Sequence, residues 1–132
     1  MSDWTLRNLK DDVENSAERF GLAPDLETHF GRKALEVEGG GFSYQRLAPD
    51  YVLPFGHRHA NANHEEVYVV LAGSGRVKLE GEEQELRQWD ALRVAGPVAR
   101  GFAAGPDGME LLAIGFGESG ESEMFQGYWD ES

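Results

Sequence analysis

Residues 65–87 read EEVYVVLAGSGRVKLEGEEQELR, and this stretch decides the fold. Apolar and polar side chains alternate within its segments, which is the period of a β-strand with one buried face. Glycines separate the segments, and "GEE" at 81–83 predicts the turn of a hairpin that joins RVKLE to EQELR. We therefore expect short antiparallel strands joined by tight turns.

The same pattern extends over residues 32–116. The predicted strands are 32–38, 41–48, 51–59, 65–72, 75–80, 83–87, 90–94, 98–103 and 109–116. Because no segment of helical period lies between them, the pattern indicates an all-β antiparallel sandwich or barrel. The seventeen glycines are explained by the number of turns.

The two ends of the chain differ from this central region. Residues 5–20 carry apolar side chains at roughly helical spacing, which predicts a short helical N-terminal arm, and a helical turn could follow Pro24 at 25–29. The last stretch is acidic and also contains aromatic residues, so it is either a loosely ordered end or a tail that docks on this domain or on a partner. We divide the single domain into the arm (1–31), the barrel (32–116) and an acidic tail (117–132).

Composition excludes several classes of function. The 132 residues suit one domain, and 24 acidic against 12 basic side chains give a formal charge of -12. Such a surface repels nucleic acid and anionic membranes. The chain has no membrane-spanning apolar segment and its start lacks the apolar core of a signal peptide, so we expect a cytoplasmic protein. Without cysteine there are neither disulfides nor thiolate metal ligands.

Residues 57–66, HRHANANHEE, concentrate three histidines and two glutamates. His57 and His59 share one face of their strand with Phe55, whereas Glu66 and Tyr68 share one face of the next strand. If these faces meet, two imidazoles and one carboxylate form the 2-His-1-carboxylate arrangement that suits divalent iron, manganese, nickel or zinc. The apolar end of the same face predicts a pocket beside the metal.

The stretch PFGHRH…HEEVYVVLAGSG resembles the first motif of the cupin superfamily. Gly56, His57, His59, Glu66 and Gly73 fill its places. The stretch WDALRVAGPVARGF at 89–102 is similar to the second motif, and the resemblance covers roughly residues 41–116. It implies a double-stranded β-helix, or jelly-roll, barrel like that of small single-domain bacterial cupin-2-like proteins of unassigned function.

The sequence departs from the family pattern at several places. Arg100 occupies the position of the histidine that supplies a fourth metal ligand, and an arginine has no lone pair to donate. Trp89 replaces a glycine, and we expect it to pack rather than to bind a ligand. The spacer before Glu66 is longer by "NAN", in which Asn61 and Asn63 are turn formers and the following His64 is either a replacement ligand or an exposed loop residue.

Arg100 leaves three hypotheses open. Because Arg100 shares a strand face with Phe102, the resemblance turns both inward. The protein could be a metal-dependent small-molecule enzyme that uses His57, His59 and Glu66. It could instead be a metal-free binding or sensing module in which Arg100 holds an anionic ligand among Tyr68, Phe55 and Phe102. Third, a Glu66–Arg100 ion pair could close the pocket. An inward Arg100 repels a metal ion unless an anion bridges them.

Assembly is the last expectation. Strand 32–38 and the N-terminal arm supply edges and apolar faces that one small barrel cannot cover, and small cupins commonly pair in this way. We therefore expect a homodimer.

Overall fold

The computed structural model describes residues 3–118 and 120–130, and most of its regular secondary structure is β-strand. The remaining residues of the predicted arm and tail, 1–2, 119 and 131–132, lie outside the described residues. The elements are η1 (Ser16–Glu18), β1 (Leu26–Phe30), α1 (Arg32–Leu35), β2 (Gly40–Leu47), β3 (Phe55–His59), β4 (Glu65–Leu79), β5 (Glu82–Arg87), β6 (Ala91–Ala95), β7 (Arg100–Phe116), β8 (Ser122–Gln126) and η2 (Tyr128–Asp130). The predicted all-β barrel is confirmed.

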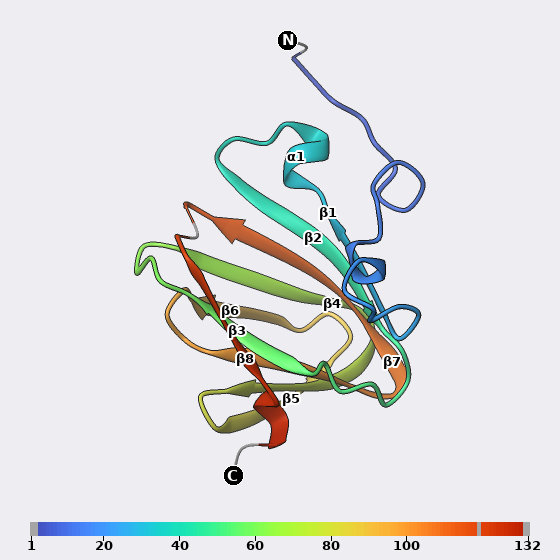
Figure 1. The fold of residues 1–132 in the computed structure, drawn as a ribbon, viewed down its shortest axis with the longest axis vertical. Coiled ribbons are helices and arrows are strands. Elements are labelled where there is room, and N and C mark those ends of the chain that lie inside the picture. Colours follow the sequence, from blue (N-terminus) through green and yellow to red (C-terminus); the bar gives the residue numbers. More distant parts are fainter. Residues whose placement is uncertain (1–2, 119, 131–132) are drawn as a thin grey trace.

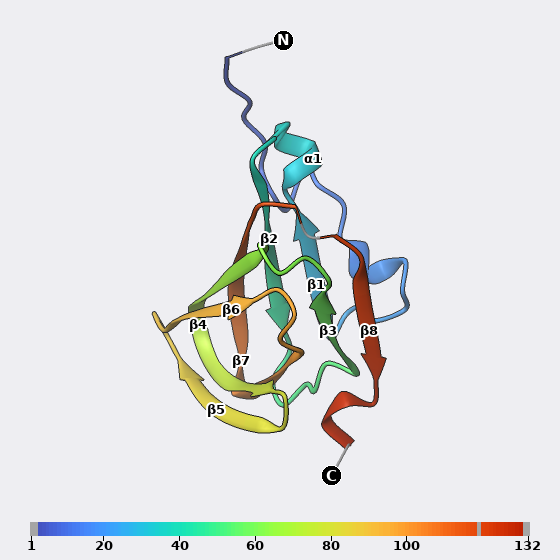
Figure 2. The same cartoon turned by 90° about the vertical axis from the view of Figure 1, so that its left-hand side faces the viewer.

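Two long strands, β4 and β7, form the spine of the sheet. They pair antiparallel from Glu65 opposite Phe116 to Leu79 opposite Arg100. On one side β7 continues through β2 to β1, and β3 and β8 follow the Arg100 end of β7. On the other side β4 carries β5 and β6. Figures 1 and 2 show these strands curled around a common interior, with the N-terminal segment at one end and η2 at the other.

The spine is longer than predicted because bulges carry it across its glycines. Segments 65–72 and 75–80 are one strand, and segments 98–103 and 109–116 are another. The β4–β7 register shifts on both sides of Gly73. Gly73 has φ +75°, and a Cβ there would lie 2.0 Å from the carbonyl oxygen of Gly108. Only glycine fits this close approach, so the break in the pattern is a bulge rather than a strand end.

Apolar side chains from both halves of the spine meet inside the barrel. The most deeply buried are Leu47, Val70, Val77, Met109 and Leu111. They pack with the aromatic rings of the cavity described below into one cluster. This core fixes β2, β4 and β7 relative to one another, which holds the strand that carries Glu66 in place.

The predicted helical arm is wrong. Within the described residues before β1, the helical turns are limited to the 3-10 turn η1, capped by the side chain of Asn15. Asn8 accepts hydrogen bonds from the backbone of Lys10 and Asp11, so a polar side chain competes with helix formation. Leu6 is 77% exposed, and the apolar spacing of 5–20 therefore forms no buried face.

Two further element predictions are wrong. Residues 25–29 do not form a helical turn, because β1 pairs along β2 from Leu26 opposite Leu47. Residues 32–38 are not a strand: Arg32–Leu35 form α1, and Glu36 ends it in the left-handed conformation. Arginine, lysine, alanine and leucine are good helix formers, so helix propensity at 32–35 outweighs the weak alternation of apolar and polar residues. The strand predicted at 51–59 begins only at Phe55.

The acidic tail docks on the barrel. Strand β8 pairs with β3 along its whole length, and Tyr128 of η2 is buried against the backbone of Gly56 and Gly101. The Tyr128 hydroxyl lies within hydrogen-bond distance of the carbonyls of Lys78 and Ala99. Of the two alternatives, a loose end is therefore wrong and docking on this domain is confirmed.

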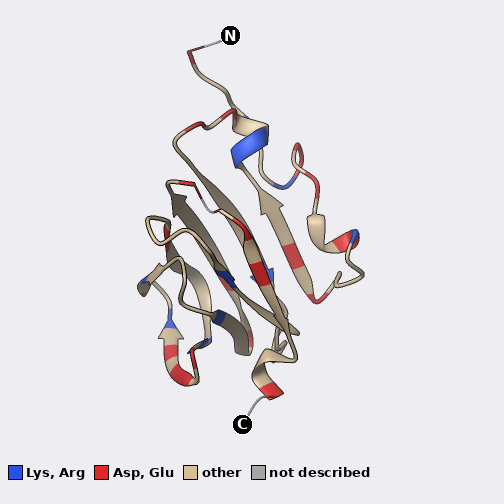
Figure 3. Cartoon of the chain, turned by 60° about the vertical axis from the view of Figure 1, so that its left-hand side comes forward, with Lys and Arg blue, Asp and Glu red and all other residues tan. Residues whose placement is uncertain are grey.

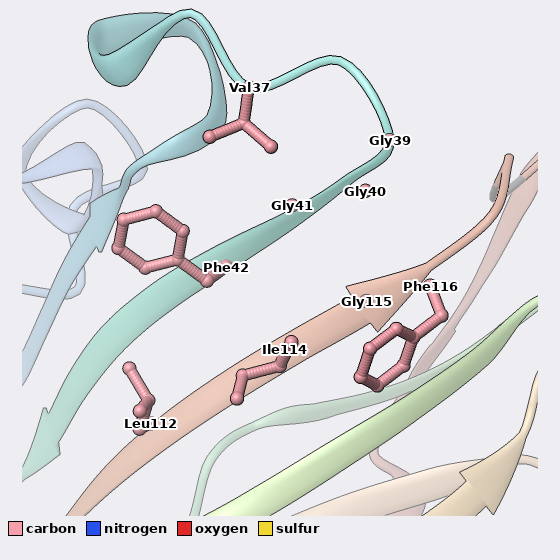
Figure 4. Close-up of a pocket in the computed structure, with 9 residues that line it drawn as sticks. All are labelled: Val37, Gly39, Gly40, Gly41, Phe42, Leu112, Ile114, Gly115 and Phe116. Atoms are coloured by element: carbon pink, nitrogen blue, oxygen red, sulfur yellow. The ribbon is translucent and has the colours of Figure 1, made fainter. Parts of the chain in front are cut away.

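The outer surface carries two further features. Acidic side chains lie in several separate places, including the β4–β5 hairpin (Figure 3). A groove of about 500 Å³ runs over the outer face of β2 and β7, where the side chains of Val37, Phe42, Leu112, Ile114 and Phe116 project (Figure 4). Of the helices in the described part of the chain, none is both long and apolar enough to cross a membrane.

Candidate metal centre

Strands β3 and β4 bring the predicted triad together. One ligand atom each from His57, His59 and Glu66 can be chosen so that all lie within 4.8 Å of one another. The alternation of β3 turns both imidazoles to the inside, and β4 presents Glu66 opposite them. Strand parity and the glycine spacing of the sequence therefore identified the correct three residues for one cluster.

The Oε1 atom of Glu66 is the centre of the cluster. His59 Nε2 lies 3.2 Å from it, and the Tyr68 hydroxyl donates to it at 2.6 Å. His57 Nε2 lies 3.7 Å and Arg100 Nη1 3.5 Å from the same atom. One carboxylate oxygen thus faces two imidazoles, a phenol and a guanidinium, and all of these groups except Arg100 are uncharged when the histidines are neutral.

The surroundings keep the carboxylate ionised and His57 neutral. Burial alone would raise the pKa of Glu66, but the contacts from His57, His59 and Tyr68 outweigh it and hold this pKa well below its usual range. Burial lowers the pKa of His57, and Arg100 adds to that effect. Burial also raises the pKa of the Tyr68 hydroxyl, so this residue remains a hydrogen-bond donor. An ionised Glu66 and a neutral His57 are the forms of these two side chains that can bind a metal.

Arg100 points inward, as predicted, and it is completely buried. Its Nη2 donates to the carbonyl of Ala95 at 2.9 Å, while Nε and Nη1 have no hydrogen-bond partner. Glu66 is therefore the counterion of Arg100 at 3.5 Å. The two unpaired N–H groups leave the guanidinium only partly satisfied, which is costly for a buried charge.

The expectation of an exposed His64 is wrong. The backbone of His64 is tied to Asn61 and Gly96, and its side chain is buried with 4% exposure. Its Nε2 lies 3.7 Å from the other carboxylate oxygen of Glu66, and neither ring nitrogen has a hydrogen-bond partner. His64 does not join the compact cluster of the other three residues, so its predicted role as a ligand stays a prediction.

A cavity of about 360 Å³ opens on one side of the cluster. Phe55, Tyr68 and Phe102 line it as predicted, and the rings of Tyr68 and Phe102 lie 4.7 Å apart. Glu66 and Arg100 are its only charged lining residues. The Glu66–Arg100 pair of the third hypothesis is present and the cavity lies beside it, so the closure of the site by this pair stays a prediction. That these rings bind a ligand stays a prediction.

A second, smaller cavity of about 220 Å³ reaches the same carboxylate from another direction. His59 and Glu66 line both cavities, whereas His57 lines only the first and His64 only the second. The small residues Gly41 and Gly115 form part of its wall. The carboxylate thus separates the two spaces, with His57 on one side and His64 on the other.

Sequence reasoning missed the contribution of the two ends. Ala17 and Phe20 of the N-terminal segment and Ser122 and Met124 of β8 line the larger cavity. The Ser122 hydroxyl lies 3.2 Å from Nδ1 of His59 and orients this imidazole. No local signal marks Ser122, because only the pairing of β8 with β3 places it there.

Of the other residues that the sequence analysis singled out, some lie as predicted and some do not. Trp89 is 70% exposed, so the prediction that it packs is wrong; its φ of 72° explains why a glycine suits this position. Glu65, the other glutamate of the cluster in the sequence, faces outward and pairs with Arg93. Asn61 accepts a hydrogen bond from the backbone of Asn63, which confirms the turn.

The barrel of the described residues has the cupin fold, and the triad lies on its inner face. Solved structures agree. A cupin protein from Bacteroides fragilis matches with a TM-score of 0.71 and 24% identity, over 89% of this chain and 86% of that chain.

Two other similar structures come from a transcriptional regulator and from an enzyme. The cupin domain of an XRE family transcriptional regulator from Enterobacter cloacae matches with a TM-score of 0.61 and 17% identity, over 71% of this chain and 98% of that one. A variant of salicylate 1,2-dioxygenase from Pseudoaminobacter salicylatoxidans matches with a TM-score of 0.61 and 18% identity, over 76% of this chain and 30% of that one. Comparisons with protein-family models and with curated proteins found no match. At these identities the likeness establishes the fold alone.

Proposed function

We propose that this protein binds one divalent first-row transition metal through His57, His59 and Glu66 and acts on a small molecule in the adjoining cavity. The observation that carries the proposal is the compact cluster of two imidazoles and an ionised carboxylate at the wall of an apolar cavity. This donor set suits iron, manganese, nickel or zinc and leaves positions open for a substrate. Dioxygenases are represented among the proteins of the same fold.

The residues present fit a bound cation. Ser122 holds the distal nitrogen of His59, and Tyr68 donates to Glu66, so two of the three ligands are already oriented by outer groups. The unpaired nitrogens of the buried His64 are also accounted for if this side chain reaches the metal or the metal-bound carboxylate. When bound, the metal would act as a Lewis acid or bind oxygen.

The protein's own residues would then orient the substrate and exclude water. Leu53, Phe55 and Phe102 form an apolar wall beside the cluster, which favours the apolar part of a small molecule. Arg100 offers two unpaired N–H groups from the same wall, so it would hold the anionic part. We therefore propose an anionic small-molecule ligand.

The alternative is a metal-free binding or sensing module. The Arg100–Glu66 contact favours it, because an ion pair without a metal already neutralises both buried charges. The Enterobacter cloacae match is itself a domain of a transcriptional regulator. In this alternative the anionic ligand replaces Glu66 as the counterion of Arg100.

Elemental analysis of protein purified without a histidine tag separates the two functions. The metal proposal predicts about one equivalent of Fe, Mn, Ni or Zn, together with a higher melting temperature when that metal is added. In the variant His57→Ala both effects should disappear, whereas the matched surface change Arg58→Ala should retain them. If neither retained metal nor a shift of the melting temperature is found in the wild type, the metal proposal is refuted.

We also propose that two copies pair through the groove on β2 and β7. The groove is lined only by apolar residues and glycines, so it offers an uncharged contact on a chain whose net charge otherwise opposes self-association. The partly exposed Phe116 and Val37 lie at its edge. The predicted strand at 32–38 plays no part in this proposal, since it is not a strand.

A further inference from the structure

The Oε1 atom of Glu66 faces two candidate cations. The two candidate histidine ligands and the Arg100 guanidinium all lie around this single oxygen. A metal ion held by the triad would share the carboxylate that now balances Arg100, and would weaken this balance. The guanidinium is buried in the wall of the cavity, so a weakened counterion is costly for its charge.

The charges of the site show what is then missing. In the metal-free cavity, one positive Arg100 balances one negative Glu66, and no other charged side chain lines the wall. A divalent ion would leave a surplus of positive charge in an apolar space, which is unfavourable. A carboxylate added to the metal-free cavity would leave a surplus of negative charge and compete with Glu66. Each species alone is therefore opposed, whereas a monocarboxylate bound together with the metal halves the surplus of two positive charges that the metal alone would leave.

The shape of the cavity indicates what carries the carboxylate. Nη1 of Arg100, which faces Glu66 and has no hydrogen-bond partner, can donate to one oxygen of a ligand carboxylate. Away from this donor the wall is apolar, and Phe20, Phe30 and Met124 line it with 69%, 55% and 50% of their surface exposed. Exposed apolar side chains along a cavity favour an apolar portion of the ligand.

We infer that the site takes small apolar monocarboxylates and that the carboxylate and the metal ion bind cooperatively, because Arg100 requires a new counterion when Glu66 binds the metal. This inference rests on the proposed metal function and names the ligand class of that site. Cooperativity between two ligands is reciprocal, so each must raise the affinity for the other by the same factor.

Calorimetric titration of tag-free, metal-free protein tests the inference. Mn²⁺ is titrated alone, then with saturating benzoate, and then with benzamide, which has the same shape without the charge. We expect benzoate to tighten Mn²⁺ binding by at least about tenfold, the usual size of such coupling. Benzamide should leave the affinity unchanged. The reverse titration, benzoate with and without Mn²⁺, should give the same factor.

Two variants locate the effect. Arg100→Met removes the charge at similar length, so Mn²⁺ alone should bind more tightly than to the wild type and benzoate should no longer matter. Arg58→Met removes an exposed arginine that pairs with Glu123 outside the cavity, so it should retain the coupling. The wild-type titrations decide the question even if Arg100→Met does not fold.

The outcomes are distinguishable. If Mn²⁺ binds with the same affinity in benzoate, in benzamide and in buffer, the inference is overturned while the metal function stands. If benzoate binds only in the absence of metal, the inference is also overturned and the metal-free alternative is supported. If neither Mn²⁺ nor the pair of ligands binds, the proposed function fails and the inference fails with it.

Discussion

Replacing Tyr128 by alanine should destabilise the barrel strongly, although this residue belongs to the acidic tail. The ring is buried with 4% exposure over two glycines of β3 and β7: a Cβ at Gly56 or at Gly101 would lie 2.6 Å from it. Removing a large buried aromatic side chain costs about 3–5 kcal/mol. The hydroxyl contacts to Lys78, Glu80 and Ala99 would be lost as well. We expect a loss of about 4 kcal/mol in the free energy of unfolding.

Urea unfolding followed by tryptophan fluorescence measures this loss. With a slope of roughly 2 kcal/mol per molar urea, the midpoint should fall by about 2 M. Tyr128→Phe keeps the ring and should lose only about 1–3 kcal/mol, because buried backbone groups lose their partner. Glu123→Ala on the same tail removes an exposed ion pair with Arg58 and should cost at most about 1 kcal/mol. A midpoint for Tyr128→Ala within about 0.3 M of the wild type, where the slope converts to well under 1 kcal/mol, would refute the described docking of the tail.

Three further predictions concern the site and the surface. The contacts of Glu66 hold its pKa well below the ordinary value of 4.5, so the unfolded chain takes up this proton first and the metal-free wild type should lose stability as the pH falls below about 4.5. Glu66→Gln should lack that part of the acid loss in urea titrations at several pH values. Ser122→Ala frees Nδ1 of His59 and should weaken metal affinity by about 10–100-fold in competition with a chelator, with the fold unchanged by circular dichroism. Ile114→Glu places a charge in the outer groove and should convert a dimer to a monomer in light scattering, whereas a wild-type monomer would contradict the pairing proposal.

Sequence reasoning correctly placed the residues whose orientation follows from the two-residue alternation of a β-strand. His57, His59 and Glu66 share a cluster because two strands alternate regularly and face one another. Arg100 points inward for the same reason. The resemblance to the cupin motifs added that these residues belong to one site, which period alone does not provide, since β3 and β4 are not hydrogen-bonded to one another.

Sequence reasoning misplaced or missed the residues whose position depends on long-range contacts. His64 is buried because its loop folds back on Gly96, and nothing within the loop indicates this. Ser122 reaches His59 across 63 positions of sequence. The glycines around Gly73 suggested a strand end, although β7 carries β4 through them as a bulge. Tertiary pairing overrode local pattern in each case.

The carboxylate of Glu66 forms part of the wall of two cavities, and this has a consequence for the order of binding events. A ligand that fills the larger cavity leaves the second carboxylate oxygen and His64 facing the smaller one. Water or another small co-reactant therefore has a separate entrance to the same group. Under the proposed function, two reactants could therefore bind in either order, since each would reach the carboxylate from its own cavity.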